Sequence, residues 1–231
     1  MHYHRLRNTA QITIDGVRVY AAGDHVPKPV RNGLYKNTYE DAERRLLQQI
    51  LRRGDRVLEI GAGIGVVGLV AARITGGRNV LSYEANPALE EVIQANYALN
   101  RERPQLRLKA ITPDGARVIF HQADNVLSSS VHERREACRS VTVESDSLAA
   151  VLEEFSPDVL VMDVEGAETQ LLSSAPLDGI RAIVLELHPH IVGEEAIARL
   201  EAHLEASAFK KVAEDRKTVL LERDAAVVSA S

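Results

Sequence analysis

The chain has 231 residues, 45% of them apolar and 26% charged, which is the composition of a folded protein with one α/β domain or two small ones. Its formal net charge of -5 provides no overall positive field, which argues against nucleic acid or an anionic membrane as the partner. A single cysteine, Cys138, excludes an intrachain disulfide and a cysteine-built zinc site. The sequence contains no run of about 18 apolar residues, the length that a membrane span requires. We therefore expect a cytoplasmic protein.

The first predicted element is a β-hairpin in "QITIDGVRVY", residues 11–20, where apolar and polar residues alternate on both sides of an Asp-Gly turn. Residues 21–37 are rich in Pro and Gly and are predicted to form a loop. A helix is predicted to start at Thr38, with Asp41 as its capping-box partner. These boundaries divide the chain into a hairpin with its lead-in loop, residues 1–37, and a main domain, residues 38–231.

Strand and helix patterns alternate through the main domain. Strands are predicted in "RVLEI", "NVLSYE", "QLRLKAI", "ARVIFHQ", "SVTVES", "DVLVMD", "RAIVLEL", "AFKKVA" and "KTVLLE". Helices are predicted in "GIGVVGLVAARI", "NPALEEVIQANYALN", "SLAAVLEEF" and "EEAIARLEAHLEA". The alternation predicts an α/β fold with a mostly parallel sheet, and the three residues between the last two strands predict an antiparallel pair. This arrangement resembles the Rossmann-like sheet of class I methyltransferases.

A glycine-rich stretch, "LEIGAGIGVVG", follows the first strand of the main domain and opens a helix. From Glu59 it matches the acidic-x-G-x-G-x-G pattern of loops that hold S-adenosylmethionine, and from Gly63 it matches the dinucleotide fingerprint G-x-G-x-x-G. In the dinucleotide pattern the first glycine closes the strand, and the register that begins at Gly61 fails at Val66. A carboxylate at Glu59 benefits a sulfonium and not a phosphate, so the loop favours S-adenosylmethionine.

The next predicted strand ends in Glu84, 23 residues after Gly61, at the spacing where an acidic side chain accepts hydrogen bonds from ribose hydroxyls. Because both cofactors contain a ribose, Glu84 indicates an adenosine ligand without choosing between them. Asn86, the predicted cap of the following helix, joins the cofactor-binding candidates. Tyr35 and Tyr39 are weaker candidates for the wall of the same pocket.

A later apolar strand ends in Asp163 and runs directly into Glu165, Gly166 and Glu168. With "LEIGAGIG" and "SYEANP" before it, this segment resembles the FkbM-type methyltransferases, whose hallmark is a strand that runs into Asp-x-Glu-Gly-x-Glu. The likeness continues in "TYEDAE", "YALN", "NVLSSS" and "VLELHPH", and it extends over residues 38–190.

The resemblance implies transfer of a methyl group from S-adenosylmethionine, usually to a hydroxyl of a sugar or a natural product. The cofactor residues that it implies by position are Glu59, Gly61, Gly63 and Glu84. It also implies that Asp163 lies beside the reacting methyl and contributes to cofactor binding. Family members often carry Asn in place of Gly63 and Lys in place of Val161.

An alcohol is a poor nucleophile, so such a transfer needs a general base or a metal. Asp163 and "ELHPH" end strands that we expect to be adjacent, which would bring Glu186 and His188 near Asp163. Two options stay open: His188 or Asp163 is the general base, or these three residues bind a divalent metal such as Mg or Mn. A purely structural His188 beside Pro189 is the third interpretation.

Two other functions stay open beside an O-methyltransferase. A nicotinamide-dependent oxidoreductase would require the out-of-phase glycines, and the sequence contains no Tyr-x-x-x-Lys. A cofactor-binding fold that catalyses nothing and serves as an interaction module is the other. The expected partner is a small molecule with a hydroxyl acceptor, and the sequence leaves open whether the chain forms a homo-oligomer.

Overall fold

The centre of the protein is a seven-stranded sheet, seen in a computed structural model that describes residues 10–23, 26–123 and 138–224. In spatial order the strands are β12 (Phe209–Asp215), β13 (Thr218–Arg223), β11 (Ala182–Glu186), β10 (Val159–Met162), β3 (Val57–Ile60), β4 (Val80–Tyr83) and β5 (Gln105–Arg107). Strand β13 is antiparallel to both of its neighbours, and the strands from β11 to β5 are mutually parallel. The predicted Rossmann-like sheet with its antiparallel C-terminal pair is therefore confirmed.

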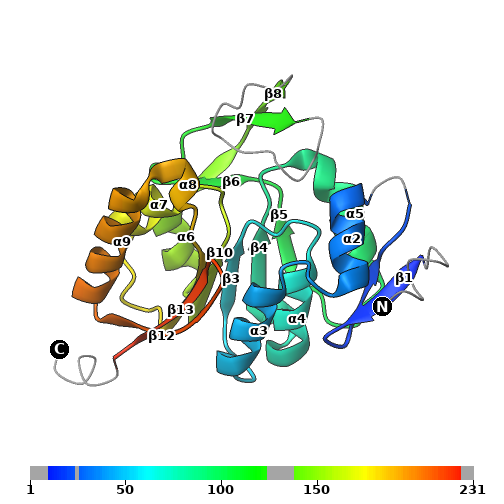
Figure 1. The fold of residues 1–231 in the computed structure, drawn as a ribbon, viewed down its shortest axis with the longest axis horizontal. Helices are drawn as coiled ribbons and strands as arrows, with labels where there is room; N and C mark the ends of the chain where they lie inside the picture. The colour runs from blue at the N-terminus through cyan, green and yellow to red at the C-terminus, as the bar shows by residue number, and fades with distance from the viewer. Residues whose placement is uncertain (1–9, 24–25, 124–137, 225–231) are drawn as a thin grey trace.

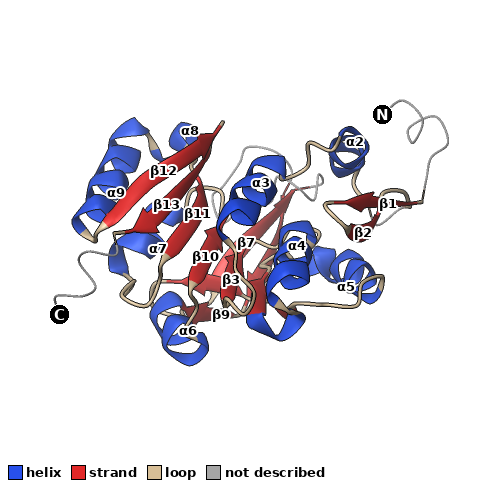
Figure 2. Ribbon diagram, turned by 90° about the horizontal axis from the view of Figure 1, so that it is seen from below, coloured by secondary structure: helices blue, strands red, loops and turns tan. Residues whose placement is uncertain are grey.

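Helices cover both sides of this sheet (Figures 1 and 2). On one side lie α3 (Asp41–Ile50), α4 (Val66–Thr75) and α5 (Glu90–Ala98). On the other side lie α6 (Leu148–Phe155), α7 (Glu168–Ser174) and α9 (Glu194–Ala206). The described residues also form three short helices, η1 (Gly77–Asn79), η2 (Pro87–Leu89) and α8 (Pro189–Val192).

Alternation along strand β3 determines which side chains reach which helical layer. Leu58 and Ile60 belong to the core shared with α6, α7 and α9, whereas Val57 belongs to the core shared with α3 and α4. Glu59 therefore has the parity of Val57 and faces the α3 and α4 layer. The chain moves outward from β3 to β5 on one side and continues in β10 and β11 on the other, so strand order reverses next to β3, where such sheets bind ligands.

The predicted N-terminal hairpin is confirmed as β1 (Gln11–Ile14) and β2 (Val17–Tyr20), joined through Asp15 and Gly16. The loop prediction for residues 21–37 is wrong in part, because α2 (Lys28–Lys36) forms there. Proline is tolerated in the first turn of a helix, and the apolar residues of this segment share one buried face. The hairpin and α2 join a hydrophobic core with α4 and α5.

Two other local predictions are corrected. Helix α3 begins at Asp41 and not at Thr38, because Glu40 has a left-handed backbone with φ 46° that interrupts the helix. The segment "QLRLKAI" splits into β5 and a separate β6 (Ala110–Thr112), which pairs with β9 (Ser145–Ser147). Strand β7 (Val118–Ala123) pairs with β8 (Cys138–Val143) in a hairpin above the sheet (Figure 1). The segment "NVLSSS" lies outside the described residues.

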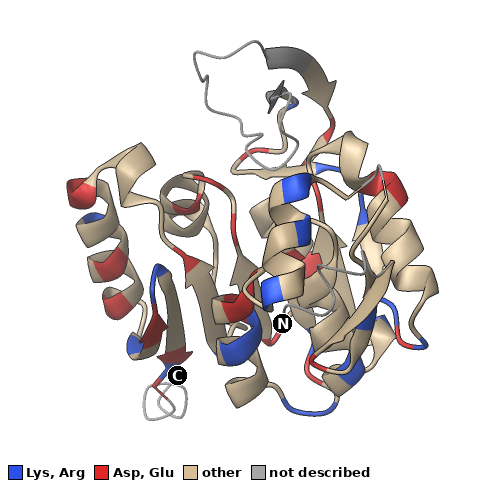
Figure 3. Cartoon of the chain, turned by 45° about the vertical axis from the view of Figure 1, so that its right-hand side comes forward, with Lys and Arg blue, Asp and Glu red and all other residues tan. Residues whose placement is uncertain are grey.

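Acidic and basic positions are interspersed over the elements in view in Figure 3, and helix α9, at the left, carries several acidic ones. None of the helices in the described part of the chain has the length and apolar character that a membrane span requires.

Candidate functional site

A cavity of about 400 Å³ opens at the carboxyl ends of β3, β4 and β10. Its wall contains five of the residues predicted from the sequence to bind the cofactor: Gly61, Gly63, Glu84, Asn86 and Asp163. They come from three strand ends that are far apart in the sequence and meet because the strands are parallel neighbours. The position agrees with the rule that ligands of open α/β sheets bind where strand order reverses.

The glycine loop is held closely between the two neighbouring strands. The backbone N–H groups of Gly61 and Ala62 both donate to the Tyr83 carbonyl, at 3.0 Å. A Cβ atom at Gly61 would lie 1.9 Å from the backbone oxygen of Asp163, and Gly61 has φ 93°. Position 61 therefore admits glycine alone in this conformation, which keeps the end of β3 in contact with the end of β10.

Glu84 connects the glycine loop to the start of η2. Its Oε2 accepts a hydrogen bond from Gly63 N at 2.8 Å, and its Oε1 accepts one from Asn86 N at 2.7 Å. Burial raises the pKa of Glu84 to about 7, against the opposing effect of these backbone donors. Asn86 Oδ1 accepts from Ala88 N at 3.1 Å, which confirms Asn86 as the cap of this short helix.

Glu59 does not line the cavity. Its carboxylate lies under α4, where a Cβ at Gly68 would meet Oε2 at 2.4 Å and the Ser82 hydroxyl at 2.8 Å. The residue is 1% exposed, and burial raises its pKa to about 7. Family members often carry lysine at position 161. In this chain the apolar Val161 is paired in register with Glu59 on the neighbouring strand. A direct cofactor contact by Glu59 stays a prediction, and this geometry places the carboxylate behind the loop.

Glu40 lines the cavity and was not predicted from the sequence as a site residue. A Cβ at Gly63 would lie 2.7 Å from Glu40 Oε1 and 2.6 Å from the Tyr39 hydroxyl, so both side chains press against the glycine loop. Glu40 Oε2 is buried and accepts no hydrogen bond within the described residues. Burial, then the nearby Glu43, raises the pKa of Glu40 well above its usual range. Its left-handed backbone has no signature in the sequence, although "TYEDAE" is part of the family resemblance.

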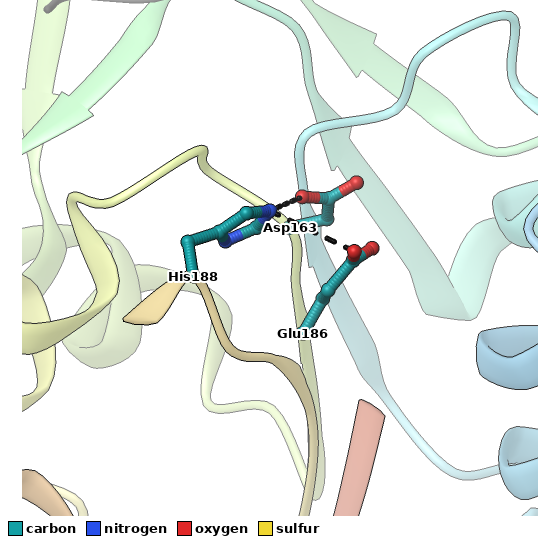
Figure 4. A group of neighbouring side chains, drawn as sticks. All are labelled: Asp163, Glu186 and His188. Carbon is teal, nitrogen blue, oxygen red and sulfur yellow. Dashed lines mark ion pairs between the residues drawn. The ribbon is translucent and has the colours of Figure 1, made fainter. Parts of the chain in front are cut away.

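Asp163, Glu186 and His188 meet at the ends of β10 and β11 (Figure 4), as the expected adjacency of these strands predicts. His188 Nε2 lies 3.6 Å from Asp163 Oδ1 and 3.7 Å from Glu186 Oε1. On the other side of the ring, Nδ1 lies 3.5 Å from Oε1 of the buried Glu168. Asp163 lines the cavity, whereas Glu186 and His188 stand behind it.

The protonation of this cluster follows from its crowding. Burial, then the charge of Glu186, raises the pKa of Asp163 to about 8. Burial also raises the pKa of Glu186, with Glu43 as the next cause. For His188, burial lowers the pKa but the surrounding carboxylates outweigh it, so that its pKa is raised overall. The catalytic roles predicted for Asp163 and His188 stay predictions.

A family model described as "Methyltransferase FkbM domain" matches residues 59–214, more than half of the chain. The chain belongs to the FkbM methyltransferase family. The matched range begins at Glu59 and includes Glu84, Asp163 and the Glu186–His188 segment, so the FkbM assignment and the site coincide. The predicted family, with S-adenosylmethionine as the methyl donor of this kind of domain, is confirmed.

More distant likenesses involve other methyltransferases. A ribosomal protein L11 methyltransferase of Streptococcus equi subsp. zooepidemicus is 27% identical over 104 residues, which are 42% of this chain and 32% of the relative. The chain thus spans about a third of the length of the curated relatives that it matches. A solved ribosomal protein L11 methylase of Lactobacillus delbrueckii subsp. bulgaricus has a TM-score of 0.47 at 12% identity, over 79% of this chain and 77% of that one. Magnesium protoporphyrin IX methyltransferase of Synechocystis PCC 6803, solved with bound SAM, has a TM-score of 0.48 at 12% identity, over 96% and 89%.

Proposed function

We propose that this FkbM-family protein transfers the methyl group of S-adenosylmethionine to a hydroxyl oxygen of a small molecule, a sugar or a natural product. The observation that carries the proposal is the wall of the cavity, where a glycine loop, the carboxylate of Glu84 and the carboxylate of Asp163 come together at adjacent strand ends. A cavity of about 400 Å³ falls within the range of pockets for small ligands.

The adenosine half of the cofactor suits the Glu84 side of the cavity. Each oxygen of Glu84 accepts one backbone hydrogen bond, and a carboxylate oxygen can accept a second. The ribose hydroxyls would supply these additional donors, and the glycine loop allows the ligand to approach the backbone closely.

The methionine half carries a sulfonium and an α-ammonium group, and the cavity wall also contains the carboxylates of Glu40 and Asp163. Glu40 offers a buried carboxylate oxygen that has no hydrogen bond within the described residues. Asp163 lies on the same wall, and Glu43 adds a buried carboxylate behind it. Opposite charge close to a buried carboxylate stabilises its ionised form, so a cationic ligand suits this wall.

Methyl transfer requires the acceptor oxygen, the methyl carbon and the sulfur to lie in line. Asp163 is the titratable group of the cluster that reaches the cavity, so we assign it the proton of the acceptor hydroxyl. His188 Nε2 lies 3.6 Å from Asp163 Oδ1, and when it is protonated its charge stabilises the ionised form of this carboxylate.

The test is binding of S-adenosylmethionine and of S-adenosylhomocysteine by isothermal titration calorimetry, followed by transfer of labelled methyl to a panel of sugars and natural products. Glu84→Gln should weaken binding about 10- to 100-fold, since hydrogen bonds to a charged group are worth about 1.5–3 kcal/mol. Glu153→Gln, a change at an exposed position of α6, is the matched control and should bind like the unchanged protein. A folded protein that binds neither ligand refutes the proposal, and methylation confined to nitrogen acceptors refutes the choice of a hydroxyl.

A further inference from the structure

Three side chains, one on the cavity wall and two behind it, have the geometry of ligands around one ion. Asp163, Glu186 and His188 each offer one ligand atom, and these atoms all lie within 4.8 Å of one another. The separations of His188 Nε2 from the two carboxylate oxygens, 3.6 and 3.7 Å, are too long for hydrogen bonds. Two atoms that are each about 2.1 Å from a shared ion lie about 3–4.2 Å apart, so the observed distances suit an ion between them.

The imidazole of His188 is a second and independent indication of a ligand. Its side chain is 5% exposed, and its Nε2 is directed at the two carboxylates, as Figure 4 shows, without a hydrogen bond among the described residues. Asp163 Oδ1, which faces it, is a buried oxygen that also accepts no hydrogen bond within the described residues. The buried Asp163 Oδ1 faces the imidazole without a hydrogen bond, so its electron pairs are available to a third partner.

Glu168 is placed to hold the histidine in the form that binds metals. This glutamate is fully buried, and its carboxylate accepts from Gly166 N at 2.8 Å and from His188 N at 3.0 Å. The same carboxylate faces His188 Nδ1 at 3.5 Å. A carboxylate behind one ring nitrogen favours the proton on that nitrogen and leaves the lone pair on the other, which is the arrangement behind metal-bound histidines.

The charges of the cluster also call for a cation. The carboxylates of Asp163, Glu186 and Glu168 surround one imidazole, so with all three ionised even a protonated histidine leaves the group negative. Glu43, another buried carboxylate, accepts a hydrogen bond from the Thr218 hydroxyl and contributes, after burial, to the raised pKa of Glu186. Buried carboxylates are stable when they are paired or bound to a metal.

We propose that Asp163, Glu186 and His188 bind one divalent cation, of the Mg²⁺ or Mn²⁺ class, which coordinates the acceptor hydroxyl. The two carboxylates supply the hard oxygen ligands that these ions prefer, the imidazole adds one borderline nitrogen ligand, and open positions are left for water and substrate. The inference rests on the proposed function for the identity of the coordinated group. Asp163 has two carboxylate oxygens. Oδ1 binds the cation, and the other oxygen stays available to a ligand in the cavity.

In this reaction the cation lowers the pKa of the bound hydroxyl, and the oxygen attacks the methyl carbon. The new O–C bond forms as the C–S bond breaks, and the electron pair of that bond stays on sulfur, giving neutral S-adenosylhomocysteine. The hydroxyl proton passes to the free oxygen of Asp163 and from there to water.

The test measures Mn²⁺ binding to the metal-free full chain in the absence of any cofactor. Electron paramagnetic resonance detects the Mn²⁺ that remains free in solution. We expect one site per chain, weakened at least 10-fold by Glu186→Gln and by His188→Ala. Glu195→Gln, at a position 88% exposed on α9, is the matched control and should leave Mn²⁺ binding unchanged. If Glu186→Gln still binds S-adenosylhomocysteine, the variant is folded, and its loss of Mn²⁺ affinity is a local effect.

The outcomes separate the two proposals. An unchanged protein that takes up no Mn²⁺ at millimolar concentration, or Mn²⁺ binding that persists in both variants, overturns the metal site. Methyl transfer at full rate after chelation with EDTA overturns the role of the cation and leaves the proposed function standing. Mn²⁺ binding by a chain that binds no S-adenosylmethionine overturns the proposed function and leaves the metal site standing.

Discussion

Replacing Gly61 by alanine tests how closely the glycine loop is fitted to its neighbours. The new Cβ would lie 1.9 Å from the backbone oxygen of Asp163, and Gly61 has φ 93°. Gly54, with φ 91° and no atom within 4 Å of its Cβ position, is a matched control that carries the backbone cost alone. A side chain in such a sparsely populated conformation costs about 1–3 kcal/mol. The contact with a strand backbone adds about 1–3 kcal/mol at position 61 only.

Urea unfolding of the two variants measures this difference directly. We expect Gly54→Ala to lose the smaller amount and to keep its affinity for S-adenosylhomocysteine. Gly61→Ala should lose more stability and also bind the ligand at least 10-fold more weakly, because relief of the contact must separate the ends of β3 and β10 on the cavity wall. Equal destabilisation of the two variants, with equal affinity, would show that the contact at Gly61 is relaxed at little cost and would refute the reasoning.

Burial raises the pKa values of Glu59 and Glu84 from 4.5 to about 7, so the folded chain holds protons that the unfolded chain releases between these values. The free energy of unfolding of the ligand-free protein should therefore fall as pH rises from about 4.5 through 7, and urea unfolding of Glu59→Gln should show a shallower fall. Glu40→Gln should weaken binding of S-adenosylmethionine more than that of S-adenosylhomocysteine in calorimetry, since only the former carries the sulfonium charge; equal losses would contradict this. Arg44→Ala should lower the free energy of unfolding in urea by about 3 kcal/mol, because it removes a buried guanidinium that pairs with Asp15 of the hairpin. Arg78→Ala, at an exposed position, should change this free energy little.

The sequence predicts those parts of the site that depend on strand order. Parallel neighbours bring their carboxyl ends to one edge, which is why the closeness of Asp163 to Glu186 and His188 could be expected from "DVLVMD" and "RAIVLEL" alone. Local chemistry also predicts the cap formed by Asn86, whose side chain accepts from the backbone two residues later.

The remaining features depend on tertiary structure. Glu40 has a left-handed backbone that holds its carboxylate against Gly63, and the sequence pattern there is that of an ordinary helix start. Strand parity places the Glu59 carboxylate on the α4 side of the sheet, with Val57. The glycine pattern instead predicts a contact between Glu59 and the cofactor. Helix α2 was missed because its buried apolar residues are few and its prolines and glycine are typical of a loop.

Under the proposed function, the distribution of charge around the cavity favours the substrate complex over the product complex. Glu40, Glu84 and Asp163 line the wall, and burial raises the pKa of each, so their ionised forms are disfavoured while no cation is present. If S-adenosylmethionine binds here, its sulfonium and ammonium charges compensate two of these carboxylates. Methyl transfer removes the sulfonium charge and leaves a neutral thioether beside the same acids. The product complex then lacks one compensating charge, so that the acidic wall that favours binding of the donor also favours release of S-adenosylhomocysteine after transfer.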